Sequence, residues 1–237
     1  MNEAYIYDTI RSPRGKRKNG SLHEITPTDL LSKLMLFLSS KHDLNTSEID
    51  DVIVGCVMPV GDQGANIGKT AAQYAGWDID IPGMQINRCC GSGLEAINLA
   101  AMKIRSGWEE LIVAGGIESM SRVPMGSDLG SMAFEPKVSF NNIYVPQGIG
   151  ADLIASIDGY SRTELDELAL QSHRRAIDAH KKNKFKSMIP IFDQNGMLLL
   201  DKDEHLRKDC TMKDLSALKP AFEKIGQMGF DAFANEK

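Results

Sequence analysis

The sequence lacks the features that mark several large classes of protein. Its 237 residues contain no apolar run near the ~20 residues that a membrane-spanning helix needs. Its opening residues lack the charged-then-apolar order of a signal peptide. The net charge is −5, so no excess of positive charge favours nucleic acid or an anionic membrane surface. We therefore expect a cytoplasmic protein with neither a nucleic-acid partner nor a membrane partner.

Cysteine is also scarce, with four residues at positions 56, 89, 90 and 210. Four cysteines in a chain of this length do not make a disulfide scaffold, which favours a reducing compartment. No two of them form a C-x-x-C pair, and adjacent cysteines rarely bind the same tetrahedral metal ion. Closely spaced histidine pairs are absent from their neighbourhood. The sequence therefore predicts no metal site.

The first half of the chain predicts alternating strands and helices. Alternating apolar and polar residues predict a strand at 4–11, and compact apolar runs predict buried parallel strands. A proline after Thr26 and an acid in the first turn predict a helix start. The remaining predicted elements are a short helix at 66–76, a strand at 82–88 and an apolar, buried helix at 94–107; the buried strands are 51–58 and 110–116. Strand, helix and strand at this spacing form a right-handed parallel βαβ unit.

The second half has a different composition. Residues 121–148 are rich in Gly, Pro, Ser and Asn and show little periodicity, which predicts a long loop. Ser161 and Glu164 form a capping box that opens a helix reaching about residue 183. Further on, residues 188–201 predict a hairpin with Asn195-Gly196 at its turn, and residues 211–222 a short helix that Pro220 stops.

The stretch INRCCGSGLEAI, residues 86–97, places two cysteines at the bend between a predicted strand and a predicted helix. Free backbone N–H groups and the helix dipole at such a place favour negative charge, so a cysteine there suits a thiolate nucleophile. GSGLEA also matches the G-x-G-x-x-A turn that binds dinucleotides, with Glu118 as its ribose-binding acid. Simple packing of small residues is the third alternative, and the spacing leaves all three open.

Four segments, in the same order, resemble motifs of the thiolase family. NRCCGSGLEAI is similar to the active-site motif N-R-x-C-x-S-G-L, and VAGGIESMS to the Gly-Gly-x-Glu-Ser-Met motif. RSPRGK resembles the amino-terminal R-T-P-x-G-K loop, with Ser12 in place of threonine. VPQGIGADLIA, followed by GYSRTELDELALQSHRRA, resembles the start of the inserted loop domain. Together the matches cover essentially the whole chain.

The resemblance implies a fold and a chemistry. The fold would be a thiolase-like three-layer α/β/α domain over 1–120, with an inserted loop-rich α+β domain that binds coenzyme A over 121–237. The reaction would move an acyl group between a 3-ketoacyl-CoA and CoA through a cysteine acyl-enzyme. Both a degradative 3-ketoacyl-CoA thiolase and an acetyl-CoA acetyltransferase fit. CoA and acyl-CoA would be substrates, with no tightly bound cofactor, and we expect a homo-oligomer, either a dimer or a tetramer.

The same resemblance assigns individual residues. Cys90 would be the nucleophile and carry the acyl thioester, while Cys89 would be a small packed side chain. Gln147 and Lys219 would contact CoA, and a solvated surface charge is the equal alternative for Lys219. Glu118 and Ser119 would hold a strand end and its loop rather than take part in chemistry. The histidines are expected to be surface residues rather than bases: His23, His42, His173, His180 and His205.

The family's later motifs would fall beyond Lys237. They are Asn-x-Ala-Phe, Gly-His-Pro and Cys-x-Gly, which supply an oxyanion-hole asparagine, a base histidine and a second cysteine. We therefore expect the carboxyl-terminal half to be absent and the chain alone to be inactive. The alternative is a non-catalytic fragment that binds CoA or a subunit, and a nicotinamide-dependent oxidoreductase is a more distant third.

Overall fold

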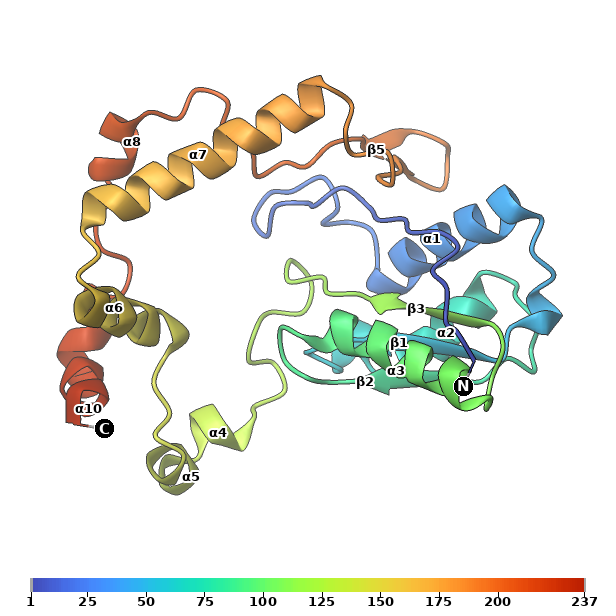
Figure 1. Cartoon of the computed structure of the whole chain (residues 1–237), viewed down its shortest axis with the longest axis horizontal. Helices are drawn as coiled ribbons and strands as arrows, with labels where there is room; N and C mark the ends of the chain where they lie inside the picture. The colour runs from blue at the N-terminus through green and yellow to red at the C-terminus, as the bar shows by residue number, and fades with distance from the viewer. Residues whose placement is uncertain (1, 237) are drawn as a thin grey trace. The chain divides into compact units, whose positions relative to one another are not determined.

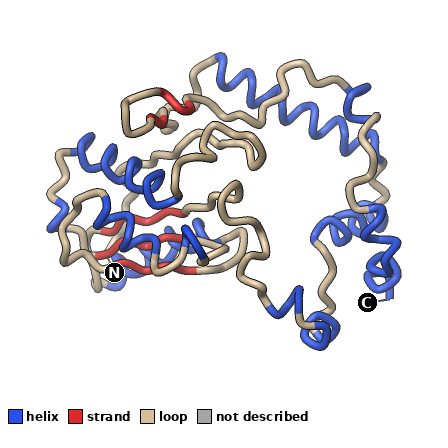
Figure 2. Tube along the Cα trace, turned by 180° about the vertical axis from the view of Figure 1, so that it is seen from behind, coloured by secondary structure: helices blue, strands red, loops and turns tan. Residues whose placement is uncertain are grey.

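The computed structural model describes residues 2–236 and divides the chain into two compact units. The first unit comprises Met1–Asp128 and Lys186–His205, and the second comprises Leu129–Phe185 and Leu206–Lys237. Figure 1 shows the strands β1 to β3 and the helices α1 to α3 of the first unit, and Figure 2 separates helix from strand by colour. The hairpin predicted at 188–201 therefore packs with the first unit. The functional boundary at residue 120 stays a prediction.

A parallel three-stranded sheet forms the centre of the first unit, with strand order β2-β1-β3. The strands are β1 (Asp51–Gly55), β2 (Gly83–Ile86) and β3 (Ile112–Gly116). Val52 pairs with Gly83 on one side and with Val113 on the other. All five residues of β1 are buried, as its continuous apolar run predicts for a central strand.

Helices cover both faces of this sheet, which confirms the α/β fold (Figure 1). Helices α1 (Pro27–His42) and α2 (Ile67–Tyr74) pack on one face, where the side chains of Val52 and Val54 join the larger core cluster. Helix α3 (Ser92–Ser106) packs on the other face, where Ile53 contacts Ala96 and Ala100. The alternating faces of β1 thus produce three layers.

Helix α1 begins where the sequence predicts. The Thr26 side chain accepts a hydrogen bond from the Asp29 backbone N–H at 3.1 Å, and Pro27 occupies the first helical position. Capping of this kind satisfies a donor that the first turn leaves free.

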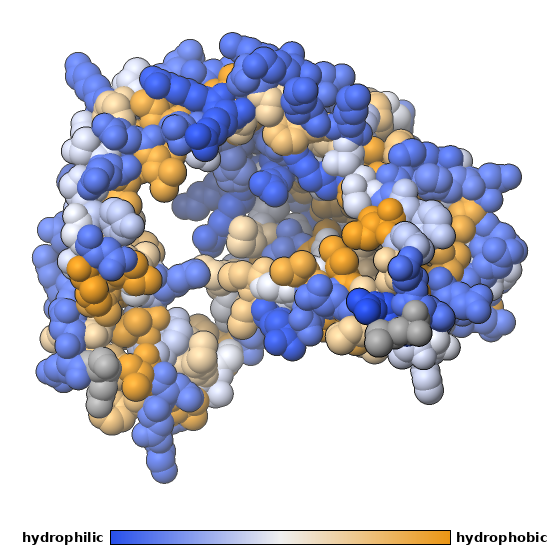
Figure 3. All heavy atoms as spheres, in the orientation of Figure 1, coloured by the Kyte–Doolittle hydropathy of each residue, from blue (hydrophilic) through white to orange (hydrophobic). Residues whose placement is uncertain are grey.

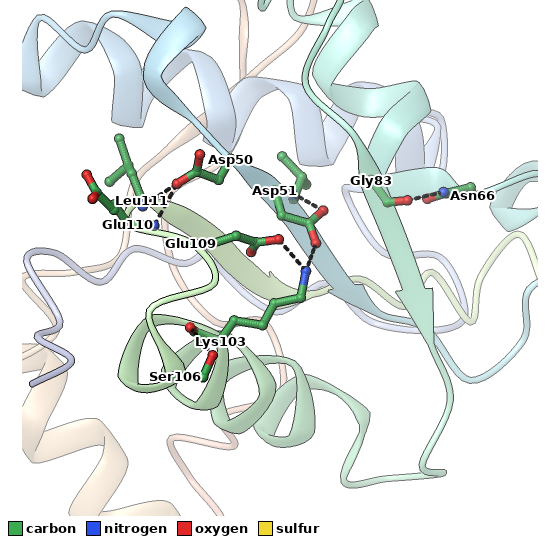
Figure 4. A network of polar contacts seen from close by, with 10 residues as sticks. Asp50, Asp51, Asn66, Gly83, Lys103, Ser106, Glu109, Glu110 and Leu111 are labelled. Atoms are coloured by element: carbon green, nitrogen blue, oxygen red, sulfur yellow. Dashed lines mark hydrogen bonds and ion pairs between the residues drawn. The ribbon is translucent and has the colours of Figure 1, made fainter. Parts of the chain in front are cut away.

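An ion-pair network fixes α3 to the sheet (Figure 4). The Lys103 Nζ lies 2.5 Å from the Asp51 Oδ2 and 2.7 Å from the Glu109 Oε1. Burial lowers the pKa of Lys103, but the hydrogen bonds and charges of these two carboxylates outweigh it and leave that pKa raised. The network joins the carboxyl end of α3 to the amino end of β1. The amino end of α3 is therefore held at the carboxyl edge of the sheet.

Short strands and 3-10 turns complete the first unit. The hairpin consists of β4 (Ile191–Phe192) and β5 (Leu198–Leu200), and Gly196 adopts a φ of 79° at its turn. This confirms the Asn195-Gly196 turn, because a positive φ favours glycine. The 3-10 turns are η1 (Thr46–Glu48) and η2 (Gly61–Gln63).

The second unit is helical. Helix α7 begins with the predicted capping box, in which Ser161 and Glu164 bond reciprocally. The elements of the second unit are α4 (Ser131–Phe134), α5 (Pro136–Asn141), α6 (Gln147–Asp158), α7 (Arg162–Lys181), α8 (Met212–Ser216), α9 (Glu223–Ile225), η3 (Gly226–Phe230) and α10 (Asp231–Glu236). Among residues 2–236, no helix combines the length and apolar character that crossing a bilayer would take.

Three local predictions were wrong. Residues 4–10 do not form a strand, because a strand needs a bonded neighbour and only Arg11 has one, in a bridge to Met188. The region 121–148 is not one long loop but contains α4, α5 and the start of α6; helices of four or six residues are too short to show a period. Helix α3 is not buried all round, because only the stripe facing the sheet is covered; its exposed apolar residues are Leu94, Ile97 and Met102.

Candidate functional site

The cysteine bend lies at the carboxyl edge of the sheet, as predicted. Strand β2 ends at Ile86 and α3 begins at Ser92, with Gly91 as its N-cap. Cys89 and Cys90 therefore stand between a parallel strand and the amino end of a helix. A helix amino terminus presents N–H groups and positive dipole charge, which stabilise an anion placed there.

Two polar side chains of the motif hold the backbone of the bend. The Asn87 amide accepts a hydrogen bond from the Cys89 N–H at 2.9 Å and donates to the Val57 carbonyl at 3.0 Å. The Ser92 hydroxyl donates to the Cys89 carbonyl at 2.6 Å and accepts from the Arg88 N–H at 2.9 Å. Cys89 is thereby held at a φ of 45°, in the left-handed region that non-glycine residues seldom occupy.

Glycines allow the first turn of α3 to approach the sheet. A Cβ atom at Gly55 would stand 2.3 Å from the Ser92 carbonyl carbon, a separation that van der Waals contact forbids. At Gly116, the end of the neighbouring strand, a Cβ would meet the Gly55 carbonyl oxygen at 3.2 Å. The amino end of α3 thus rests directly on the ends of β1 and β3, which fixes the place of the bend.

Glu118 supports the same edge from the loop after β3. Its carboxylate accepts from the Val57 N–H at 2.8 Å and from the Gln63 side-chain amide at 2.6 Å. The oxygen of the Gln63 side-chain amide accepts from the Ser119 N–H at 2.6 Å. This is the structural role expected for Glu118 and Ser119. It also weakens the dinucleotide interpretation, because both oxygens of the carboxylate that would hold a ribose already accept hydrogen bonds.

Gln63 is the supporting residue that sequence reasoning missed. Its side chain is completely buried and also donates to the Met58 carbonyl at 2.9 Å. A single glutamine in a Gly-rich loop gives no sequence signal of its own, because loop glutamines are usually solvated.

The cysteines differ in their surroundings. Cys89 and Cys90 are exposed, whereas Cys56 is buried. Burial, and then the charge of Glu118, raise the pKa of the Cys56 thiol to about 11. The expectation that Cys89 packs as a small side chain was wrong, because Cys89 is exposed, as is its neighbour Cys90.

Gln147 and Lys219 both lie in the second unit and are exposed. Gln147 is the first residue of α6, and Lys219 follows α8 just before Pro220. Their chain segments meet, because a Cβ added at Gly148 would stand 2.1 Å from the Phe222 ring. The structure therefore brings the two predicted CoA-contact segments to one part of the unit.

The three histidines of the first unit each bond to another group. His42 lies 2.7 Å from Asp8, His23 lies 3.2 Å from Glu24, and the remaining one, His205, bonds to the Gly15 carbonyl at 3.2 Å. All are exposed. Surface positions of this kind agree with the expectation that none of them is a base.

Among the described residues, an open depression of about 530 Å³ lies at the amino edge of the sheet, opposite the edge that carries the bend. Its lining is Glu48, Asp50, Gly107, Trp108, Glu109, Glu110 and Leu111. Four carboxylates there repel an anionic ligand such as CoA. Within residues 2–236, no group of three or more His, Cys, Asp or Glu side chains is placed to hold a metal ion.

Comparison with known families and structures agrees with the motifs. The family described as the thiolase N-terminal domain matches residues 4–229. The crystal structure of the Bacillus anthracis acetyl-CoA acetyltransferase superposes with a TM-score of 0.80 at 31% identity, covering 93% of this chain and 59% of that one.

Curated relatives show the same partial coverage. A 3-ketoacyl-CoA thiolase of Photorhabdus laumondii is 36% identical over 232 residues, which are 95% of this chain and 59% of that protein. One of Acinetobacter baumannii is 34% identical over 230 residues, 94% of this chain and 58% of its own length. One of Colwellia psychrerythraea is 34% identical, covering 95% and 59% respectively. The chain thus spans less than two thirds of the length of these relatives.

Proposed function

Since the chain belongs to the thiolase family through its amino-terminal domain, we propose that it serves acyl transfer between a 3-ketoacyl-CoA and CoA, with Cys90 as the nucleophile. The observation that carries this proposal is an exposed thiol at the amino end of α3, on a bend that Asn87 and Ser92 hold in place. Relatives named 3-ketoacyl-CoA thiolase and a neighbour named acetyl-CoA acetyltransferase support the substrate class.

The proposed chemistry has two steps. In the first, the Cys90 thiolate attacks the 3-keto carbonyl carbon, the bond between C2 and C3 breaks, and the departing acetyl-CoA carbanion takes up a proton. In the second, the thiolate of a free CoA attacks the acyl carbon on Cys90, the bond from that carbon to the Cys90 sulfur breaks, and the shortened acyl-CoA leaves the regenerated Cys90 thiolate. The oxyanion formed at each step needs hydrogen-bond donors, which the amino end of α3 is placed to offer.

The CoA subsite of this proposal lies in the second unit. Gln147 offers an amide, and Lys219 offers a positive charge for a phosphate. The close contact of Gly148 with Phe222 supports a joint role for their two segments.

Acyl-enzyme formation tests the proposal directly. The 237-residue chain is incubated with acetyl-CoA or acetoacetyl-CoA, and the tryptic peptide that follows Arg88 is weighed and sequenced by mass spectrometry. We expect an acetyl group on Cys90 in the native chain and in Cys89→Ala, and none in Cys90→Ala. Acetylation of Cys89 alone, or of no cysteine, would contradict the proposal.

Full turnover by this chain alone is expected to be orders of magnitude below that of a complete thiolase. The histidines of the first unit bond elsewhere, and positioned acid–base catalysis contributes about 10²–10⁴ in rate. A thiolysis assay with acetoacetyl-CoA measures this, and rapid turnover that depends on Cys90 would overturn the expectation.

A non-catalytic role in binding CoA or a subunit is the second candidate, which the exposed apolar residues of α3 favour. Leu94 is 65% exposed and Met102 is 55% exposed, and apolar surface of this kind is commonly covered by a partner. We propose a homo-oligomer in the cytoplasm, which sedimentation velocity can test. Calorimetry with CoA tests the binding that both roles share: Lys219→Ala should weaken it severalfold relative to the exposed control Lys224→Ala, and acylation of Cys90 then separates the two roles.

A further inference from the structure

Cys89 is the feature of the bend that acyl transfer leaves unexplained. The proposed reaction uses a single thiol, yet the chain exposes a second one on the adjacent residue. The bend holds Cys89 through its backbone, whose N–H donates to Asn87 and whose carbonyl accepts from Ser92. Its side chain has no part in those hydrogen bonds, so the thiol is available for chemistry of its own.

Adjacent cysteines can be joined by a disulfide, but only under strain. Consecutive Cα atoms across a trans peptide are about 3.8 Å apart, whereas most disulfides span about 4.4–6.8 Å. A strained disulfide has a more oxidising potential and is readily reduced. A bond between these two residues is therefore suited to reversible control rather than to stabilising the fold.

We propose that Cys89 is a resolving cysteine, which forms a reversible disulfide with Cys90 when peroxide oxidises that thiol. In the first step the Cys90 thiolate attacks an oxygen of hydrogen peroxide; an S–O bond forms, the O–O bond breaks, and hydroxide leaves as water after taking a proton. In the second step the Cys89 sulfur attacks the sulfenic sulfur of Cys90; the S–S bond forms, the S–O bond breaks, and a second water leaves with the thiol proton.

The electrons balance over the two steps. The two thiols lose two electrons and two protons in total, and one peroxide becomes two waters. A dithiol such as dithiothreitol reverses the reaction by two thiol–disulfide exchanges and becomes the oxidised partner.

Cys56, the other cysteine of the first unit, is poorly placed to resolve Cys90. Cys56 is buried beneath the same edge, with its sulfur 3.4 Å from the Gln63 amide, and it ionises only with difficulty. Cys89 is already a neighbour through the chain itself, so its effective concentration at Cys90 does not depend on any further folding.

The consequence for activity rests on the proposed function. A sulfur bonded to Cys89 cannot accept an acyl group, so the disulfide would suspend acylation while sparing Cys90 from irreversible oxidation. Without a resolving thiol, sulfenic acid proceeds to sulfinic and sulfonic acids, which dithiols do not reduce.

The test treats the purified chain with hydrogen peroxide, blocks free thiols with N-ethylmaleimide, digests with trypsin and weighs the peptide that follows Arg88. The native chain should yield this peptide two hydrogens lighter and without maleimide on either cysteine, and dithiothreitol should restore labelling of both. In Cys89→Ser, which keeps a small side chain at the left-handed position, Cys90 should instead gain oxygen that dithiothreitol does not remove.

Phenylarsine oxide provides a second probe that needs no oxidant, because its arsenic binds two neighbouring thiols together and releases water. The native chain should bind it at least tenfold more tightly than Cys89→Ser does. Equal affinity, added oxygen on Cys90 beside a free Cys89, or a disulfide from Cys90 to Cys210 or to another chain would each overturn the proposal.

Acetylation of Cys90 by acetyl-CoA is measured on the same samples. Its absence from the reduced chain, when the disulfide forms as expected, would refute the proposed function alone.

Discussion

The two units bury their apolar side chains to very different degrees. The first has two core clusters, one on each face of its sheet, and Val52, Ile53 and Ala71 are completely buried there. In the second unit the buried apolar residues are Ile149, Leu170 and Leu215. Its exposed large apolar side chains include Phe134, Phe140, Ile154, Ile157, Leu168 and Met228. Figure 3 shows apolar surface on the visible face of the second unit.

This difference indicates that different forces hold the two units together. Burial of apolar surface stabilises the first, at about 25 cal/mol per Å². Polar contacts carry more of the second: the capping box of α7, the Arg162–Asp166 ion pair and the longer-range bond from Arg162 to the Leu215 carbonyl. Such contacts contribute about 0.5–1.5 kcal/mol each, so we expect the second unit to unfold first.

Both tryptophans of the chain, Trp77 and Trp108, lie in the first unit, and Trp77 is 5% exposed within its core. Tryptophan fluorescence therefore follows the first unit, while circular dichroism at 222 nm follows the helices of both. If the second unit is weaker, the helical signal should begin to fall at a lower urea concentration than the fluorescence. Coincident transitions would contradict the comparison.

The largest expected effect comes from Ile53→Ala in β1. Ile53 is completely buried between the sheet and α3, and truncating such a side chain costs about 2–5 kcal/mol of unfolding free energy. The fluorescence midpoint in urea should fall accordingly. Ile79→Ala removes the same atoms at a residue that is 73% exposed, and should change the unfolding free energy by less than about 0.5 kcal/mol.

A matched change in the second unit separates the two transitions. Ile149 is 2% exposed, and Ile149→Ala should lower only the first phase of the helical signal. A fall in the fluorescence midpoint as large as that of Ile53→Ala would show that the two units unfold together.

Gly148→Ala should destabilise the second unit by about 1–3 kcal/mol, because its Cβ would meet the Phe222 ring. Gly150→Ala, in the same helix and with open space around its Cβ, should instead stabilise α6 by up to about 1 kcal/mol, since alanine favours helix. Opposite shifts in the early phase of the helical signal would support the contact. Equal shifts would place Phe222 away from Gly148.

Asp203→Asn tests whether the segment after the hairpin belongs to the first unit. The Asp203 carboxylate accepts from the Arg11 guanidinium at 2.8 and 3.0 Å and from the Arg14 N–H at 2.8 Å. Removing its charge should lower the unfolding free energy from the fluorescence transition by about 1 kcal/mol. The early phase of the helical signal should stay unchanged. Asp201→Asn, two residues away and exposed, is the control. A shift confined to the early phase would contradict the unit boundary.

The smallest expected effect is a loss of stability in acid. Burial raises the pKa of Glu204, but hydrogen bonds from the Lys16 and Ser21 N–H groups and the Ser21 hydroxyl outweigh it and hold that pKa below its ordinary 4.5. The N–H groups of Glu110 and Leu111 hold the pKa of Asp50 below its ordinary 3.8. A carboxyl whose pKa is lowered by folding stabilises the fold above its unfolded pKa, and this contribution is lost as the pH falls through the folded value.

Fluorescence midpoints in urea should therefore be steady above about pH 5 and fall below about pH 4. Glu204→Gln should be less stable than the native chain at neutral pH and should lose less on acidification. The exposed carboxylate variant Glu110→Gln should follow the native curve. If the urea midpoint of Glu204→Gln falls in acid as much as that of the native chain, the lost stability belongs to other carboxylates.

The sequence by itself determined the elements whose cause is local. The Thr26 cap, the Ser161 capping box and the Asn195-Gly196 turn each depend on residues within four positions of one another, and the structure confirms them. The apolar run of β1 and the bend at Cys90 were equally visible, because a buried strand and a Gly-rich turn impose their composition on a short segment.

Only the tertiary structure decided which of these segments meet. The alternation of residues 4–11 could not reveal that a bonded neighbour is lacking for 4–10, and the composition of α3 could not reveal which side the sheet covers. The bonds of Gln63 to Glu118 and to Ser119 cross more than fifty residues of chain. The exposure of Cys89 was likewise visible only in the folded chain. A residue's type limits the contacts it can make, but long-range packing chooses among them, and that packing has no signature in any short segment.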